Sequence, residues 1–233
     1  MAYDFWYWDG LPGRGEFVRL ALEAGGVDYR ERARESGGDV SADLEAARDD
    51  PPFAPPYLAA DGMTIGQTAN ILMFLGQRHG LAPDDEAGRL WANQVQLTIA
   101  DMVAETHDTH HPVAMGAYYE DQKDEALRRA EDFRDNRIPK FLGWFETILE
   151  RRGDWLAGGD RWSYADLSLF QLVEGLRFAF PRRMKTVEAD NPRVAALRDR
   201  VAGLPELKDY LASDRRLPFS DGIFRQYPEL DGG

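Results

Sequence analysis

Hydrophobic positions near the N-terminus form a continuous run and then repeat with a helical period. The apolar and aromatic run over residues 3–8 is typical of a buried strand, because aromatic side chains favour a pleated surface, and Gly10 with Pro12 then ends it. From Phe17 onward apolar residues recur at i, i+3, i+4 and i+7, which predicts a helix that closes at Gly25. The chain therefore begins with a strand, a tight loop and a helix.

A second group of short elements follows before residue 80. Prolines bound a strand predicted over residues 57–60, Asp61 and Gly62 form a turn, and a short strand follows over residues 63–65. A helix is expected from Thr68. Antiparallel strands that follow a strand–helix unit predict a small mixed sheet with helices packed on it.

The rest of the chain has the pattern of successive helices. Long amphipathic stretches cover residues 86–110 and 119–150, and we expect the second to bend at Pro139. Gly80, Pro83 and acidic residues separate this part from the first, which predicts an α/β domain over residues 1–82 and an all-α domain over residues 83–233. The later helices have start signals at a Ser163–Asp166 capping box, at Asn191–Pro192 and at Pro205.

The loop after the first strand is a candidate ligand site. In α/β proteins such a loop, between the carboxyl end of a strand and the N-terminus of a helix, presents free backbone donors and the positive end of the helix dipole. Tyr7 lies beside it. By residue type alone, Tyr7 is either a core residue whose hydroxyl is satisfied by the backbone or a group that faces a ligand.

Composition narrows the range of partners. The net charge of −13 argues against nucleic acid and anionic membranes, and no apolar run approaches the roughly 18 residues of a membrane span. We therefore expect a cytoplasmic protein. Cysteine is absent from all 233 residues, which excludes disulfides, thiolate metal sites and cysteine nucleophiles. Any thiol used in its chemistry must arrive with a ligand.

Several motifs, in order along the chain, resemble those of the soluble glutathione S-transferases of the tyrosine type, similar to mu-, pi- and sigma-like members. The resemblance covers nearly the whole chain, and its order and spacing make it specific. The matching positions are Tyr7-Trp8-Asp9 with Gly13-Arg14, Pro56-Tyr57-Leu58, Gln67-Thr68, Gly159-Asp160 with Ser163 and Asp166, and the final helix "DYLASDRRLP".

This resemblance implies a thioredoxin-like N-terminal domain, a C-terminal helical bundle that contributes the electrophile pocket, and a homodimer. It also implies glutathione as co-substrate, with no further cofactor and no metal. Tyr7 would donate its hydroxyl hydrogen to the thiolate of glutathione, which then attacks a small hydrophobic electrophile. Apolar residues Met73 and Phe74 on the helix after Thr68 are expected at the dimer interface.

The resemblance also implies a set of glutathione-binding residues. Gln67 and Thr68 would bind the γ-glutamyl carboxylate at a helix N-terminus, or they are an ordinary helix cap. Arg14 would lie near the same end of the ligand, or it is a solvated helix start. Pro56, after Pro55, would be the family's cis-proline. Glu105, in "IADMVAE", would reach the ligand's amino group from the partner subunit, or it is a plain exposed side chain.

Three departures from the family pattern concern glutathione binding. The loop "GLPGR" is one residue longer than the mu-like pattern. Pro55 stands where the family usually has a residue whose N–H bonds the cysteinyl carbonyl, and proline has no N–H. Residues 30–54 contain neither Trp nor Lys, the residue types that normally hold the glycine carboxylate.

The resemblance also implies which aromatic and polar residues form the wall of the electrophile pocket. Plain core packing is the alternative for the apolar members. The residues are Trp8, His111, Met115, Tyr119 and Phe219.

Three histidines cluster near residue 110. Helical spacing puts His107, His110 and His111 on neighbouring faces, where they could ligate zinc. We favour instead that they line the pocket as polar groups or act as charges at the helix end. Pro112 ends the helix there.

Two other functions stay open from the sequence. One is a binding or regulatory protein that kept the fold and lost turnover, because fold does not fix function. The other is a glutathione-dependent lyase, isomerase or dehalogenase that uses the same Tyr7.

Overall fold

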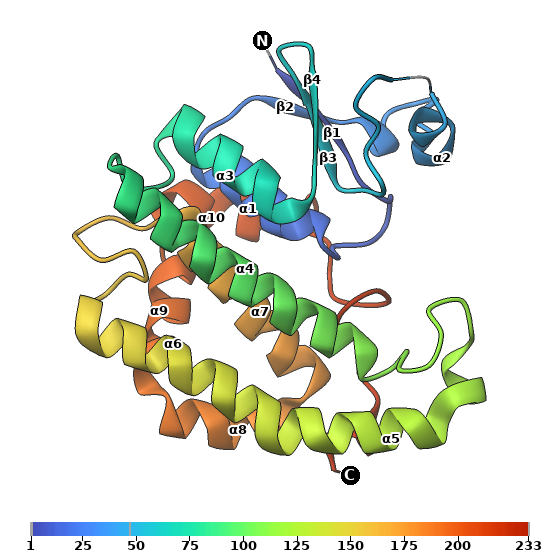
Figure 1. Ribbon diagram of the computed structural model, residues 1–233, viewed down its shortest axis with the longest axis vertical. Coiled ribbons are helices and arrows are strands. Elements are labelled where there is room, and N and C mark those ends of the chain that lie inside the picture. The colour runs from blue at the N-terminus through green and yellow to red at the C-terminus, as the bar shows by residue number, and fades with distance from the viewer. Residues whose placement is uncertain (1, 47, 233) are drawn as a thin grey trace.

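A four-stranded mixed sheet forms the N-terminal part of the molecule (Figure 1). The computed structural model describes residues 2–46 and 48–232. The strand order is β2-β1-β3-β4, with β1 parallel to β2 and antiparallel to β3, and β3 antiparallel to β4. The strands are β1 (Tyr3–Trp6), β2 (Tyr29–Glu31), β3 (Tyr57–Ala60) and β4 (Met63–Gly66).

The first strand is shorter than the sequence predicts. It ends at Trp6, whose partner Tyr57 is the first residue of β3, so the chain beyond Trp6 has no neighbouring strand to pair with. Tyr7 therefore lies just past the end of the sheet. The hairpin over residues 57–66 forms as predicted, and β2 is an addition that the hydrophobic pattern did not indicate.

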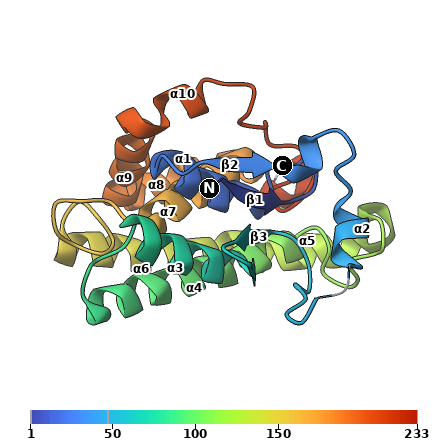
Figure 2. The same cartoon turned by 90° about the horizontal axis from the view of Figure 1, so that it is seen from above.

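Helices cover both faces of this sheet. Helices α1 (Gly15–Ala24) and α3 (Thr68–His79) belong to the main core, together with Phe5 and Leu58 of the sheet. On the other face of the sheet, the short helix α2 (Val40–Leu44) packs against Trp6 of β1 and Tyr57 of β3. A 3-10 turn, η1 (Arg32–Arg34), precedes α2 in the chain. In Figure 2 α2 lies at the right of the view, well away from α1 and α3.

The second part of the chain is a bundle of helices. The predicted helix over residues 119–150 is interrupted by a π-helical stretch just before Pro139, where proline has no N–H to donate and its ring crowds the preceding turn. The elements are α4 (Glu86–Asp108), η2 (Tyr119–Gln122), α5 (Lys123–Asp132), η3 (Phe133–Arg137), α6 (Ile138–Arg152), α7 (Tyr164–Ala179), α8 (Pro181–Asp190), α9 (Pro192–Ala202), η4 (Pro205–Leu207), α10 (Lys208–Leu211) and η5 (Pro228–Asp231).

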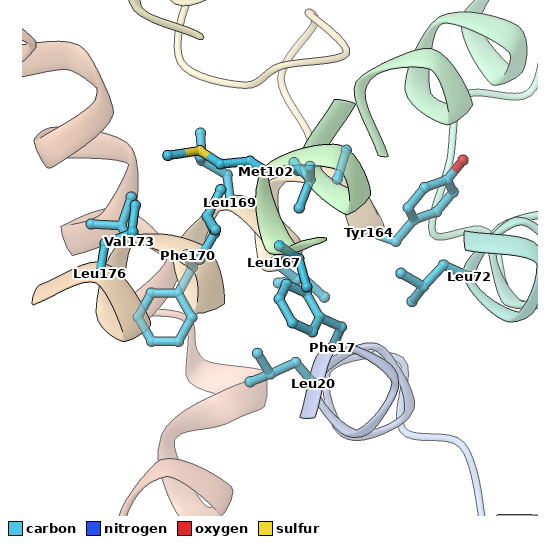
Figure 3. Packing of buried hydrophobic residues seen from close by; sticks show 14 of the residues in the cluster. Phe17, Leu20, Leu72, Met102, Tyr164, Leu167, Leu169, Phe170, Val173 and Leu176 are labelled. Atoms are coloured by element: carbon cyan, nitrogen blue, oxygen red, sulfur yellow. The ribbon is translucent and has the colours of Figure 1, made fainter. Parts of the chain in front are cut away.

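The two parts share one continuous hydrophobic core. Helix α7 is buried along most of its length, and α1 packs against it. Figure 3 shows Phe17 and Leu20 of α1 beside Leu167 and Phe170 of α7. Because α1 carries the loop that follows β1, its packing on α7 fixes the position of that loop relative to the helical bundle.

The predicted capping box at the start of α7 is present. The carboxylate of Asp166 accepts hydrogen bonds from the Ser163 N–H at 2.7 Å, the Ser163 hydroxyl at 2.8 Å and the Leu156 N–H at 2.8 Å. Asp166 is fully buried, and burial raises the pKa of its carboxyl to about 6. The helix predicted after Asn191 also begins at Pro192, but the Asn191 amide donates to the Val187 carbonyl instead of capping α9.

Replacing Asp166 with Ala is expected to lower the free energy of unfolding by about 3 kcal/mol. The variant loses the helix cap, and two buried backbone N–H groups are left without acceptors. Urea denaturation followed by circular dichroism measures it, and the exposed neighbour Asp160→Ala is the matched control. Equal unfolding free energies for the two variants would contradict the stabilising role of Asp166.

Candidate active site

Tyr7 packs tightly against the loop that joins β1 to α1. It is 6% exposed, and its hydroxyl oxygen accepts a hydrogen bond from the Arg14 N–H at 2.9 Å. A Cβ atom at Gly13, where φ is +40°, would lie 2.0 Å from that oxygen. A Cβ atom at Gly15 would lie 2.6 Å from the ring. The glycines of "GLPGRG" are therefore needed for the backbone to approach the phenol so closely.

The environment of Tyr7 keeps its phenol protonated. Burial raises the pKa of Tyr7, whereas the Arg14 N–H and the charges of Arg14 and Arg19 act in the opposite direction. Its oxygen accepts one hydrogen bond, and no hydrogen bond among the described residues uses the hydroxyl as donor. The backbone contact alone therefore does not satisfy the hydroxyl, whose proton has no acceptor among the described residues.

The start of α3 has an unusual backbone conformation. Gln67, immediately before the helix, has φ of 67° and ψ of 122°, a combination that residues with a side chain rarely adopt. The first intrahelical bond is donated by Ile71, so the N–H groups of residues 68–70 have no partner within the helix. The buried hydroxyl of Thr68 also has no hydrogen-bond partner among the described residues. These donors and the helix dipole favour an anion at this point.

A cavity of about 430 Å³ brings these elements together. Arg14 from the first loop meets Gln67 and Thr68 from the start of α3, and α4 supplies an opposite wall that is mainly apolar. The remaining lining residues are Phe17, Ala69, Asn70, Met73, Asn93, Gln96, Leu97, Ile99, Ala100 and Val103. Arg14 lines this cavity, and it forms no ion pair within the described part of the chain.

The peptide bond between Pro55 and Pro56 is cis, as predicted. It directly precedes β3. Pro55 offers a carbonyl oxygen but no N–H at this position.

The segment before Pro55 contains arginines in place of the expected Trp or Lys. Arg48 is paired with the carboxylate of Asp43, and it also donates to the Asp43 carbonyl at 2.6 Å. The guanidinium of Arg34 donates to the Arg215 carbonyl at 3.2 Å, while its buried Nε and Nη2 atoms have no hydrogen-bond partner. Arg34 Nε also lies 3.8 Å from Asp9 and 3.9 Å from Glu31, and Arg32 Nε is likewise buried without a hydrogen-bond partner.

Glu105 is engaged in ion pairs within its own chain. Arg137 contacts both of its carboxylate oxygens, at 2.6 and 2.8 Å, and Arg129 adds a contact at 3.1 Å. These contacts lower the pKa of Glu105. Glu105 does not line the cavity that contains Arg14. That Glu105 contacts the ligand bound by a partner subunit stays a prediction. It requires Glu105 to give up at least one of its arginine contacts for the ligand.

The residues predicted for the electrophile pocket are not gathered around the cavity. Trp8 and Met115 are 40% and 75% exposed. Tyr119 is buried, stacked on Tyr227 at 3.8 Å between ring centroids. Phe219 stacks on Phe178. The structure therefore favours core packing for Tyr119 and Phe219, which was the alternative interpretation.

The histidine cluster lies between the first loop and the C-terminal tail. The rings of His107, His110 and His111 are 4.7 to 5.3 Å apart, and His110 Nε2 is 2.9 Å from the Ile223 carbonyl. Burial lowers the pKa of His110 to about 3. Burial lowers the pKa of His107, and the charge of Arg14 adds to this effect. No group of three or more His, Cys, Asp or Glu side chains in the described residues is arranged to hold a metal ion.

Comparisons with known proteins agree with this architecture. Residues 107–214 match the model of the glutathione S-transferase C-terminal domain. The mouse protein glutathione S-transferase A3 is 28% identical over 92% of this chain and 91% of its own, and the glutathione S-transferase of Plasmodium falciparum is 21% identical over 89% and 94%.

Solved structures show the same fold. Prostaglandin synthase D of Nilaparvata lugens aligns with a TM-score of 0.73 and 20% identity over 94% of this chain and all of its own. The pi-class glutathione S-transferase of Onchocerca volvulus aligns with a TM-score of 0.71 and 21% identity over 91% and 92%. In addition, no helix among the described residues is long and apolar enough to cross a membrane.

Proposed function

We propose that Tyr7 of this chain activates the thiol of a bound ligand. The chain belongs to the glutathione S-transferase family and is a glutathione transferase. The thiol is that of glutathione, because the chain itself contains no cysteine. The observation that carries the proposal is the Tyr7 hydroxyl, whose oxygen is held by the Arg14 N–H while its proton stays available.

The reaction needs the thiol in its ionised form. A free thiol has a pKa of about 8.5, so only a few per cent is thiolate at neutral pH. Lowering that pKa by about two units requires roughly 2.7 kcal/mol, about the net value of one hydrogen bond to a charged acceptor. The thiolate then forms a bond to an electrophilic carbon of a small hydrophobic substrate, and the leaving group departs with the electron pair of the broken bond.

The γ-glutamyl end of glutathione fits the start of α3. Its carboxylate would be held by the free N–H groups after Gln67, by Thr68 and by the unpaired charge of Arg14. The side chain of Gln67, placed by its unusual backbone conformation, is a further partner for this end. In this arrangement residues 1–82 bind glutathione, and residues 83–233 supply the wall that faces the electrophile.

The glycine end has fewer partners. Pro55 presents no N–H to the cysteinyl carbonyl, and Arg48 is already paired with Asp43. Each missing hydrogen bond is worth about 0.5 to 1.5 kcal/mol, so we expect weaker binding than a full set of ligand contacts gives. Affinity should therefore depend mainly on the γ-glutamyl end.

The electrophile would approach from the side of the histidine cluster and Trp8. His111 stacks with His107, which lies within the field of Arg14, so His111 stays in this proposal as a polar wall. Trp8 and Met115 are exposed and free to contact a substrate. The cytoplasmic location and the mu-, pi- or sigma-like class stay predictions of the sequence.

A homodimer is part of the proposal. Met73 on α3 and Leu97 on α4 are 38% and 49% exposed and both line the same cavity, which gives an apolar face beside the site. Phe74 contributes less than expected, because it is partly covered by Tyr3 and Arg78 of its own chain. Glu105 of a second copy is the proposed partner for the amino group of glutathione.

Tyr7→Phe should lower turnover at pH 7 about tenfold or more and leave glutathione affinity within a few-fold, because the hydroxyl serves the thiolate. The pKa of the bound thiol should rise. A conjugation assay with an aromatic halide, together with calorimetry, measures both effects. The control is Tyr3→Phe, which removes a hydroxyl that bonds His79. Unchanged turnover in Tyr7→Phe would remove Tyr7 from the mechanism, and glutathione binding without turnover in the wild type would favour a binding protein.

Removing the glycine of the ligand should change affinity little, whereas Gln67→Ala should nearly abolish binding. Calorimetry with glutathione and with γ-glutamylcysteine tests the first point, and the exposed Gln77→Ala is the control for the second. If losing the glycine weakens binding tenfold or more, a cation such as Arg34 holds that carboxylate and the proposed division of contacts is wrong.

Sedimentation at micromolar concentration should show a dimer, because a stable interface of this kind buries enough surface to survive such dilution. Leu97→Asp should shift the protein to a 26.4 kDa species. Leu127→Asp, on α5, should not. A monomeric wild type would remove the cross-subunit role of Glu105.

A further inference from the structure

Arg19 lies fully buried beside the ring of Tyr7. It is one of the largest side chains without exposed surface, and its guanidinium carbon is 5.7 Å from the centroid of the Tyr7 ring and 5.3 Å from that of Phe5. A guanidinium cannot lose its charge inside a protein. A permanent positive charge therefore stands within reach of the phenol, and it acts to lower the pKa of Tyr7.

Arg19 contacts both β2 of the sheet and the loop that precedes α1. It pairs through Nε and Nη2 with Glu31 of β2, and Nη1 lies 3.5 Å from Glu16. The same Nη1 donates to the Pro12 carbonyl at 3.4 Å, which also accepts from the Glu16 N–H at 2.8 Å. Arg19 thus helps to hold the backbone that carries Arg14 to the Tyr7 hydroxyl.

Glu16 connects this group to the C-terminal segment. It is 1% exposed, and its Oε1 accepts hydrogen bonds from the Tyr210 hydroxyl at 2.8 Å and from Arg216 Nη1 at 2.9 Å. Arg216 also donates to Gln171 of α7 at 3.2 Å. Residues almost 200 positions apart in the sequence therefore share one buried carboxylate.

The group is balanced in charge. The carboxylates of Glu16 and Glu31 face the guanidinium groups of Arg19 and Arg216. A buried ion pair is weak evidence for stability, because desolvation offsets most of the attraction. In a region of low dielectric constant, however, the loss of one member leaves an uncompensated charge whose field extends to neighbouring groups.

We propose that Glu16 and Arg216 are positioning residues for the reaction, and that together with Arg19 they set the electrostatic potential at Tyr7 and at the thiolate in front of it. This inference rests on the proposed function. It assigns the C-terminal segment a part in thiol activation without any contact to substrate. The segment acts through Glu16, Arg19 and the loop at Pro12.

Other charged groups around the cluster stay unchanged in the test. Arg14 faces Tyr7 from the loop, and Arg34 lies 3.9 Å from Glu31. Glu23 accepts from the Tyr29 hydroxyl and pairs with Arg215. A shift seen when only Glu16 or Arg216 is changed therefore reports the charge removed.

The sign of each effect follows from charge alone. Glu16→Gln removes a negative charge and keeps an oxygen for Tyr210 and Arg216, so it should lower the pKa of the bound thiol. Arg216→Gln removes a positive charge and should raise that pKa. Burial raises the pKa of Glu16, and the charges of Arg216 and Arg19 act in the opposite direction; in Arg216→Gln the carboxylate keeps its contacts with Arg19 and Tyr210. At an effective dielectric constant of about 20, a unit charge about 10 Å away changes a pKa by about 1 unit.

The experiment is a pH titration of the thiolate absorbance of bound glutathione in the wild type and in three variants. Glu16→Gln should shift the midpoint down by about 1 pH unit, and Arg216→Gln should shift it up by about half a unit. Tyr210→Phe is the matched control, because it removes a hydrogen bond to Glu16 and leaves every charge in place. It should lower the melting temperature with no shift in the titration.

Opposite shifts in the two charge variants support the inference, since a purely structural role would move both midpoints in the same direction or, as in Tyr210→Phe, move neither. Shifts of the same sign, or none, overturn it while the proposed function stands. If Glu16→Gln does not fold, Arg216→Gln decides alone, and an unchanged or lower midpoint overturns the inference. A wild type that binds no glutathione overturns both the inference and the proposed function.

Discussion

The hydrogen bond from the Arg14 N–H to the Tyr7 hydroxyl is the contact on which the rest of the site depends. It requires the loop to fold back onto the phenol, and that approach is possible only because Gly13 and Gly15 have no side chain. Because the Tyr7 oxygen is the acceptor in this hydrogen bond, the hydroxyl keeps its proton. The local backbone thus orients the oxygen, and burial of the ring keeps the hydroxyl neutral.

This loop is held from two sides. Phe17 and Leu20 anchor α1 to α7 in the shared core, so the loop keeps a fixed position relative to the helical bundle. Glu16 and Arg19, on the same helix, face a buried polar cluster that includes the C-terminal segment. A single short helix therefore joins the hydrophobic packing of the molecule to the polar contacts around Tyr7.

Much of the N-terminal part of the chain and the helical character of the rest could be predicted from local pattern. The hairpin over residues 57–66, the helix from Thr68 and the capping box at Asp166 each depend on residues close together in the sequence. The strand over Tyr29–Glu31 was missed because it is short and has only one paired neighbour. Sequence patterns record local preference, and they carry little information where pairing with a distant strand decides the structure.

The sequence by itself determined the absence of a thiol, the place of Tyr7 before a glycine-rich loop and the fold that these motifs accompany. Only the tertiary structure decided how the polar residues are used. It paired Glu105 with Arg129 and Arg137, buried Tyr119 against Tyr227, and brought Arg216 to Glu16. The reason is physical: a charged or aromatic side chain takes its role from the partners that burial forces on it, and those partners come from distant parts of the chain.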